Sequence, residues 1–158
     1  MMSAKHIEGG EQQETFGESI ALHLLPGTVV YLEGDLGAGK TTLVRGILRG
    51  LGYTGTVRSP TYTLMESYDT NNCVVHHFDL YRLGDPEELE YLGIRDVCDD
   101  QSILLIEWPD KGRGFLPAVD LQINISHLPS SREISFEAKG GKGEAFVAAM
   151  SESSDTIN

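Results

Sequence analysis

The sequence has few basic residues. Only 12 lysines and arginines stand against 24 aspartates and glutamates in 158 residues, which gives a net charge of −12. Proteins that hold DNA or RNA neutralise its phosphates with lysine and arginine, so this chain is not expected to hold a nucleic acid by itself. If the chain acts on a nucleic acid, a partner protein must bind that nucleic acid.

Cysteines and long apolar runs are also scarce. No stretch approaches the length needed to span a membrane, and residues 1–19 have neither the apolar core nor the basic lead-in of a secretory signal. Cys73 and Cys98 are too few for a disulfide framework or a zinc site. We therefore expect a cytoplasmic protein that does not associate with membranes. Its length suits one domain over 1–150, followed by a polar tail over 151–158 that we expect to be disordered.

Residues 31–42, YLEGDLGAGKTT, contain the P-loop pattern G-x-x-x-x-G-K-[ST], from Gly34 to Thr41. The glycines let consecutive backbone N–H groups turn inward and form a nest for an anion. In this pattern Lys40 reaches the β- and γ-phosphates of a nucleotide, and the Thr41 hydroxyl binds Mg²⁺. The predicted nucleotide contacts from this segment are Gly34, Asp35, Leu36, Gly37, Ala38, Gly39, Lys40, Thr41 and Thr42.

The flanks of the pattern support the interpretation. Residues 28–34 are rich in β-branched and aromatic side chains and predict a strand, whereas residues 40–52 carry apolar residues at helical spacing. Strand, glycine loop and helix form the context in which a P-loop works, because the helix N-terminus adds its dipole to anion binding. The segment therefore predicts a site for a nucleoside triphosphate.

The remaining pattern indicates an α/β protein. We expect helices over 12–25, 85–93 and 143–150, strands within 55–69, 72–83 and 102–108, and a hairpin with arms over 119–126 and 132–140. Asp85 and Glu88 suit a capping box at the start of the second of these helices, and Gly93 suits its end. The predicted fold is P-loop NTPase-like, with a mostly parallel central sheet flanked by helices and an antiparallel C-terminal hairpin. The site should lie at the carboxyl ends of the parallel strands.

Two acidic residues end predicted strands, and a P-loop protein needs an acid to hold its magnesium. Glu107 closes the apolar run ILLIE, and Asp79 follows VVHHF. We assign Glu107 to Mg²⁺, directly or through water, and to polarising the attacking water. Asp79 is assigned to the inner or outer sphere of the same ion, and the two roles are exchangeable at this stage.

The segment SPTYTL follows the predicted P-loop helix, where nucleotide switches place a sensor of the γ-phosphate. Thr61 is the first choice for this role and Thr63 the second. The competing interpretation, of nearly equal weight, is a pair of ordinary strand threonines beside a proline turn.

Several other side chains are candidates for the pocket. Trp108 directly follows the acid Glu107 and is a candidate wall, and Arg132 is a candidate to stack on adenine. His76 and His77 are neighbours on a strand and point to opposite faces, so they cannot chelate one metal ion together. We expect them to be structural, or one of them to hydrogen-bond near the site. The chain lacks the N-K-x-D segment that reads guanine in GTPases, which favours ATP.

Five segments in order, GDLGAGKTT, SPTYTL, HFDLYRL, DPEELEYLGIRD and LIEW, resemble the bacterial TsaE (YjeE) family over about residues 29–117. The resemblance implies binding of ATP and Mg²⁺, slow ATP hydrolysis by the chain alone, and action on the TsaB–TsaD pair, in which TsaD carries the transferase chemistry. The product would be threonylcarbamoyladenosine at position 37 of tRNAs that read ANN codons, with tRNA contacted only through the partners. By analogy, Lys40 and Thr41 hold phosphate and metal, and Asp79 and Glu107 are the acids of the two strand motifs.

Two other functions share these features. A small-molecule kinase also has a P-loop, but it usually needs an arginine-bearing lid, and no arginine-rich lid segment occurs here. A binding module with purely structural ATP would show no turnover and equal partner affinity with ATP and ADP.

Overall fold

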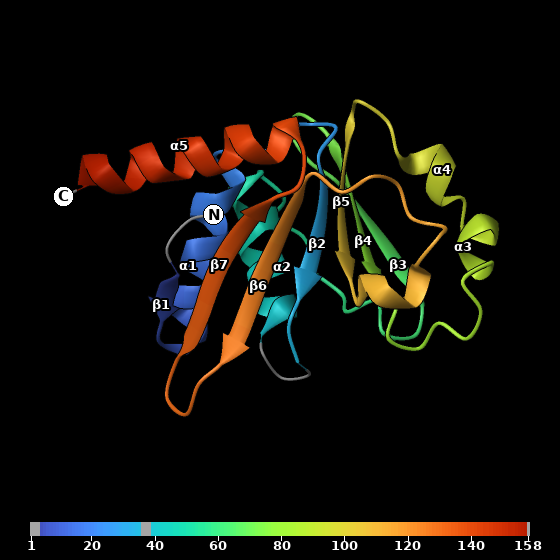
Figure 1. The fold of residues 1–158 in the computed structure, drawn as a ribbon, viewed down its shortest axis with the longest axis horizontal. Helices are drawn as coiled ribbons and strands as arrows, with labels where there is room; N and C mark the ends of the chain where they lie inside the picture. The colour runs from blue at the N-terminus through green and yellow to red at the C-terminus, as the bar shows by residue number, and fades with distance from the viewer. Residues whose placement is uncertain (1–3, 36–38, 158) are drawn as a thin grey trace.

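The computed structural model describes residues 4–35 and 39–157, which form a seven-stranded sheet with helices on both faces (Figure 1). The strands are β1 (Lys5–Ile7), β2 (Val29–Glu33), β3 (Met65–Asp69), β4 (Val74–Asp79), β5 (Ser102–Glu107), β6 (Leu121–His127) and β7 (Arg132–Ala138). The helices are α1 (Gly9–Ala21), α2 (Lys40–Gly50), α3 (Glu88–Tyr91), α4 (Ile94–Val97), α5 (Gly141–Ile157) and the 3-10 helix η1 (Pro109–Gly112).

The centre of the sheet is parallel and its edges are antiparallel. The strand order is β1-β7-β6-β2-β5-β4-β3. Strand β2 pairs in parallel with β5 and β6, and β4 pairs in parallel with β5, whereas β1–β7, β6–β7 and β3–β4 are antiparallel. The predicted α/β class with its antiparallel C-terminal hairpin is confirmed. Because β2, β4 and β5 run in the same direction, the segments that follow them gather at one edge of the sheet.

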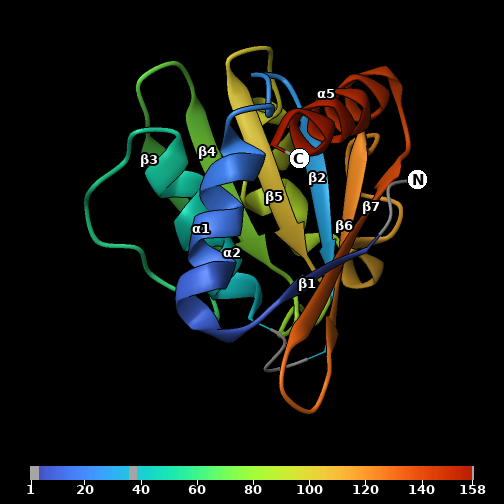
Figure 2. The same ribbon diagram turned by 90° about the vertical axis from the view of Figure 1, so that its left-hand side faces the viewer.

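Apolar side chains from the two faces of the sheet form two cores. Helices α1, α2 and α5 pack over one face, where Val30 and Leu32 of β2 join Phe146 of α5. Helices α3 and α4 cover the other face, with Leu89 and Ile94 in its core. Figure 2 shows α1 and α2 side by side on the first face. Strand β5 is buried at every residue, as predicted for a parallel strand covered on both sides.

Glycines let α1 and α2 approach closely. A Cβ atom on Gly46 of α2 would lie 2.1 Å from the carbonyl oxygen of Glu14, and one on Gly17 of α1 would lie 2.6 Å from that of Leu43. Only glycine fits at such backbone contacts. This packing fixes the N-terminal half of α1 beside the start of α2.

Several elements differ from the sequence-based expectation, among them α1, which covers Gly9–Ala21 where a helix over 12–25 was expected. Strand β1 was not predicted, because three residues are too few to show a periodic pattern. The helix expected over 85–93 consists of the short α3, which stops before Gly93 at φ +75°, followed by α4. The capping box predicted for Asp85 and Glu88 forms only in part: Asp85 N–H donates to Glu88 Oε1 at 3.2 Å, but Asp85 Oδ1 accepts from Glu87 N–H at 2.9 Å, and α3 itself starts only at Glu88, with Glu87 as its N-cap.

The last helix is longer than expected. Helix α5 covers Gly141–Ile157, so its described part includes residues 151–157, for which we expected a disordered tail. No glycine or proline follows Gly143 to end the helix. In the described part of the chain, no helix is both long and apolar enough to cross a membrane.

Candidate functional site

A cavity of about 310 Å³ lies where the segments after β2, β4 and β5 meet. It is lined by Gly39, Lys40, Thr41, Thr42, Ser59, Thr61, Asp79, Glu107 and Trp108. All of these except Ser59 are predicted site residues, so the fold brings together side chains from four separate parts of the sequence. The predicted contacts Leu36, Gly37 and Ala38 lie outside the described residues.

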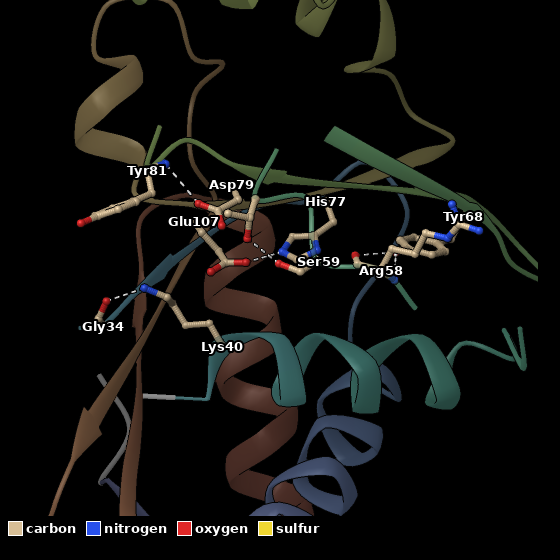
Figure 3. Close-up of polar contacts among 10 residues, drawn as sticks. Gly34, Lys40, Arg58, Ser59, Tyr68, His77, Asp79, Tyr81 and Glu107 are labelled. Carbon is tan, nitrogen blue, oxygen red and sulfur yellow. Dashed lines mark hydrogen bonds and ion pairs between the residues drawn. The ribbon is translucent and has the colours of Figure 1, made fainter. Parts of the chain in front are cut away.

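Lys40 begins α2, and its side chain reaches back to Gly34, the first residue of the P-loop pattern. Its ammonium donates a hydrogen bond to the Gly34 carbonyl at 2.5 Å (Figure 3). The same nitrogen lies 4.1 Å from the centre of the Trp108 ring. Burial lowers the pKa of Lys40, and the nearby carboxylates, Glu107 first and Asp79 next, oppose this shift. An ammonium has three N–H donors, so Lys40 can also bind phosphate oxygens from this position.

Gly39 supplies the turn before Lys40. Its φ is +96°, and a Cβ atom there would lie 2.4 Å from Nε2 of Gln13. The buried Gln13 side chain, on α1, donates through Nε2 to the Gly39 carbonyl at 2.7 Å. Sequence analysis missed Gln13, because a contact between residues 26 positions apart depends on the packing of α1 against α2.

The two predicted acids face each other across β4 and β5. Asp79 and Glu107 are register partners in these parallel strands, and both are buried. Asp79 Oδ1 accepts a hydrogen bond from Tyr81 N–H at 3.1 Å. Burial raises the pKa of Asp79, and the Glu107 charge adds to the rise, while the Tyr81 hydrogen bond, His77 and Lys40 act against it. Like charges directly opposite each other repel, so a cation between them is favoured.

These oxygen atoms suit a divalent cation that is also held by phosphate. Among the described residues, no group of three or more His, Cys, Asp or Glu side chains could hold a metal ion. Mg²⁺ does not need such a group, since it usually keeps several waters and takes one or two carboxylates plus substrate phosphates. Asp79, Glu107 and the Thr41 hydroxyl, which all line the cavity, fit that requirement.

The loop after α2 presents two hydroxyls near the cavity. Ser59 Oγ and Thr61 Oγ1 lie 2.7 Å apart, and both residues line the cavity. Thr63 instead donates to Glu66 at 3.4 Å and is exposed. The geometry therefore favours Thr61 over Thr63 as the candidate sensor. Ser59, two residues away, could have been found only from its place in the same SPTYTL segment.

Trp108 forms one wall of the cavity, as its position after Glu107 suggested. Its φ is +56°, in the left-handed region that bulky residues rarely adopt, and its ring centre lies 5.1 Å from that of Tyr81. Backbone strain of this kind is concentrated at functional sites. The Trp108 ring packs against the Lys40 ammonium, which lies 4.1 Å from the ring centre.

Arg132 is not among the residues that line this cavity. It begins β7, where it pairs in register with Ile7 of β1 and His127 of β6, and its Nη1 donates to the Ser131 carbonyl at 3.2 Å. The turn between β6 and β7 nevertheless lies at the edge of the sheet where β2 ends, because β6 and β2 are parallel.

The two histidines point to opposite faces of β4, as predicted. His76 Nδ1 lies 2.7 Å from Ser67 Oγ on β3. His77 Nε2 lies 2.5 Å from Glu107 Oε2, so one histidine does hydrogen-bond within the site.

Known proteins resemble this chain over nearly its whole length. The family model described as threonylcarbamoyl adenosine biosynthesis protein TsaE matches residues 7–134. The tRNA threonylcarbamoyladenosine biosynthesis protein TsaE of Haemophilus influenzae is 50% identical over 141 residues, which cover 86% of this chain and 89% of that protein. The Bacillus subtilis protein of the same name is 37% identical over 149 residues, covering 94% and 93%. The crystal structure of Bacillus subtilis YdiB has a TM-score of 0.79 at 31% identity and covers 98% of this chain and 99% of its own.

Proposed function

The chain belongs to the TsaE family, and from that premise we propose that it binds ATP with Mg²⁺ and hydrolyses it slowly as a subunit in tRNA threonylcarbamoyladenosine biosynthesis. The observation that carries this proposal is the cavity where Lys40 meets two buried carboxylates, Asp79 and Glu107. A lysine at a helix N-terminus suits phosphate, and two carboxylates suit a divalent cation. Together they are the set of groups that P-loop NTPases use.

Each residue then has a distinct task. Lys40 binds the β- and γ-phosphates, and the Thr41 hydroxyl, Asp79 and Glu107 supply oxygen ligands for the metal. When bound, Mg²⁺ would neutralise the negative charge that develops on the phosphates. Glu107 also orients and polarises the attacking water, because its carboxylate lines the cavity next to the site of the phosphates. The Thr61 hydroxyl binds the terminal phosphate and releases it after hydrolysis.

We place the adenine near Arg132, on which it stacks. Ile7, the register partner of Arg132, lines a second cavity of about 790 Å³ together with Phe16. Along α1 this cavity is lined by Gln12, Thr15 and Phe16, and Gln13 of the same helix contacts Gly39 at the start of α2. We propose that the nucleotide runs between these places, with its phosphates at α2 and its base beside β1.

The negative net charge of the chain indicates which role its partner proteins must have. With 24 acidic and 12 basic residues the chain is not expected to hold tRNA by itself, so other proteins would have to hold it. We propose that the TsaB–TsaD pair does so, and that this chain acts on the pair as a nucleotide-dependent switch for modification of adenosine 37 in tRNAs reading ANN codons.

The test is ATP hydrolysis by the chain alone, with the TsaB–TsaD pair, and with the pair plus a tRNA that reads ANN codons. We expect slow release of inorganic phosphate alone and strong stimulation by the pair with tRNA. Indifference to the partners would contradict the switch role. Phosphate transferred to an acceptor, with none released to water, would indicate a kinase instead. The variant Lys40→Ala serves as the negative control in every mixture.

A further inference from the structure

His77 is fully buried on β4, directly behind the predicted catalytic acid. Its Nε2 lies 2.5 Å from Glu107 Oε2, and Figure 3 shows the two side chains pointing toward each other. If Glu107 acts as a carboxylate, Nε2 is the donor in this hydrogen bond, because a carboxylate can only accept. The bond occupies one oxygen of Glu107 and leaves the other for the cavity that Glu107 lines.

Packing alone does not explain a histidine at this position. Within the described part of the chain, His77 Nδ1 is a buried side-chain atom that has no hydrogen-bond partner. An unpaired polar atom in the interior lowers stability, whereas an apolar side chain of similar shape would avoid that loss. The neighbouring His76 differs, since its Nδ1 is paired with Ser67 on the opposite face of the strand.

We propose that His77 is a positioning residue, which holds one carboxylate oxygen of Glu107 so that the other is directed at the metal and the attacking water. This inference rests on the proposed ATPase function. Ligands of a metal are commonly oriented by such outer hydrogen bonds, and loss of one costs about 10- to 100-fold in metal affinity or activity. His77 is too deeply buried to touch the substrate, so we assign its effect on the reaction to the hydrogen bond with Glu107.

Three variants separate positioning from packing. In His77→Gln the amide nitrogen reaches the place of Nε2 and can still donate to Glu107. In His77→Asn the amide nitrogen reaches only the place of Nδ1, so the contact is lost. His76→Asn makes the same change in size on the other face of the same strand and serves as the matched control.

Two readouts are needed, one of them independent of turnover. Trp108 is the single tryptophan of the chain and lines the cavity, so its fluorescence reports binding of ADP as Mg²⁺ is titrated. We expect His77→Asn to raise the Mg²⁺ concentration at half-saturation and to lower kcat for ATP hydrolysis, each by about 10- to 100-fold. At saturating Mg²⁺ the KM for ATP should change little, because the metal site is then filled and Lys40 still binds the phosphates. His77→Gln should recover most of both losses, and His76→Asn should match the wild type.

The possible outcomes are distinct. The inference is overturned if His77→Asn behaves like His76→Asn, or if His77→Gln loses as much as His77→Asn. Adding His77→Asn to a Glu107→Gln chain should cause no further loss, and an additional loss would show that His77 acts by another route. If His77→Asn does not fold, His77→Leu, which fills similar space without a donor, takes its place, and wild-type kcat and Mg²⁺ dependence in that variant would overturn the inference. A wild-type chain that binds no MgADP would overturn the proposed function, and this inference with it.

Discussion

Replacement of Lys40 by alanine tests the phosphate site most directly. The Lys40 side chain is 6% exposed and is fixed by the Gly34 carbonyl and the Trp108 ring, so it is already oriented over the loop. Hydrogen bonds to charged groups contribute about 1.5–3 kcal/mol each. Since about 1.4 kcal/mol corresponds to a tenfold change in affinity, loss of one such contact should weaken nucleotide binding about 10- to 140-fold. A P-loop lysine contacts both the β- and γ-phosphates, so ATP should lose more affinity than ADP.

Isothermal titration calorimetry with MgATP and MgADP measures both losses. The control is Lys139→Ala, a substitution that changes the net charge of the chain by the same amount. The Lys139 side chain is 41% exposed, and its Nζ lies 4.0 Å from Glu137 Oε1 on the surface. Equal nucleotide affinities for Lys40→Ala and Lys139→Ala would refute the reasoning. A loss that is the same for ATP and ADP would remove Lys40 from the γ-phosphate and leave it only on the β-phosphate.

Three further substitutions test the acids and the helix packing. Glu107→Ala should keep much of the ATP affinity and lose turnover, and a steady-state assay at the wild-type rate would remove Glu107 from catalysis. Asp79→Asn should stabilise the Mg²⁺-free chain at pH 7, because burial raises the native pKa of Asp79. Because its native pKa is raised, Asp79 contributes fully to folding stability below pH 3.8, its ordinary pKa, and this contribution is lost as pH rises through the native pKa. The stability of Asp79→Asn relative to the wild type should therefore increase over that pH range. Urea unfolding at several pH values measures this advantage, and equal stabilities throughout would contradict it. Gly46→Ala should destabilise the chain by about 1–3 kcal/mol, since its Cβ would lie 2.1 Å from the Glu14 carbonyl oxygen. Gly141→Ala, with no atom within 4 Å of its Cβ, is the control, and equal melting temperatures would refute the helix contact.

The sequence was informative where local patterns determine structure. The P-loop spacing, the apolar run of β5 and the alternation in β6 and β7 predicted the parallel centre and the antiparallel hairpin, because periodicity reports which faces of a strand are buried. Asp79 and Glu107 were predicted to lie together because parallel strands end at one edge, and they are register partners.

What the sequence could not reveal depends on contacts between distant segments. Gln13 reaches Gly39 only because glycines let α1 pack directly on α2. Alternation along β4 separates His76 from His77, but the bond to Glu107 depends on how β4 is aligned with β5. Strand β1 forms because it pairs with β7, and a segment of three residues has no sequence pattern that predicts such pairing.

The charges around Lys40 indicate why a metal and a nucleotide should bind together. Four carboxylates act on this ammonium, those of Glu107, Asp79, Glu33 and Asp35, so a single positive side chain faces several negative ones. A bare triphosphate approaching the cavity would meet these carboxylates in a chain whose net charge is −12. A divalent cation between the carboxylates and the phosphates converts that repulsion into attraction on both sides. Because coupling between two ligands is reciprocal, the nucleotide would in turn strengthen binding of the cation. Each of the two would therefore bind weakly without the other.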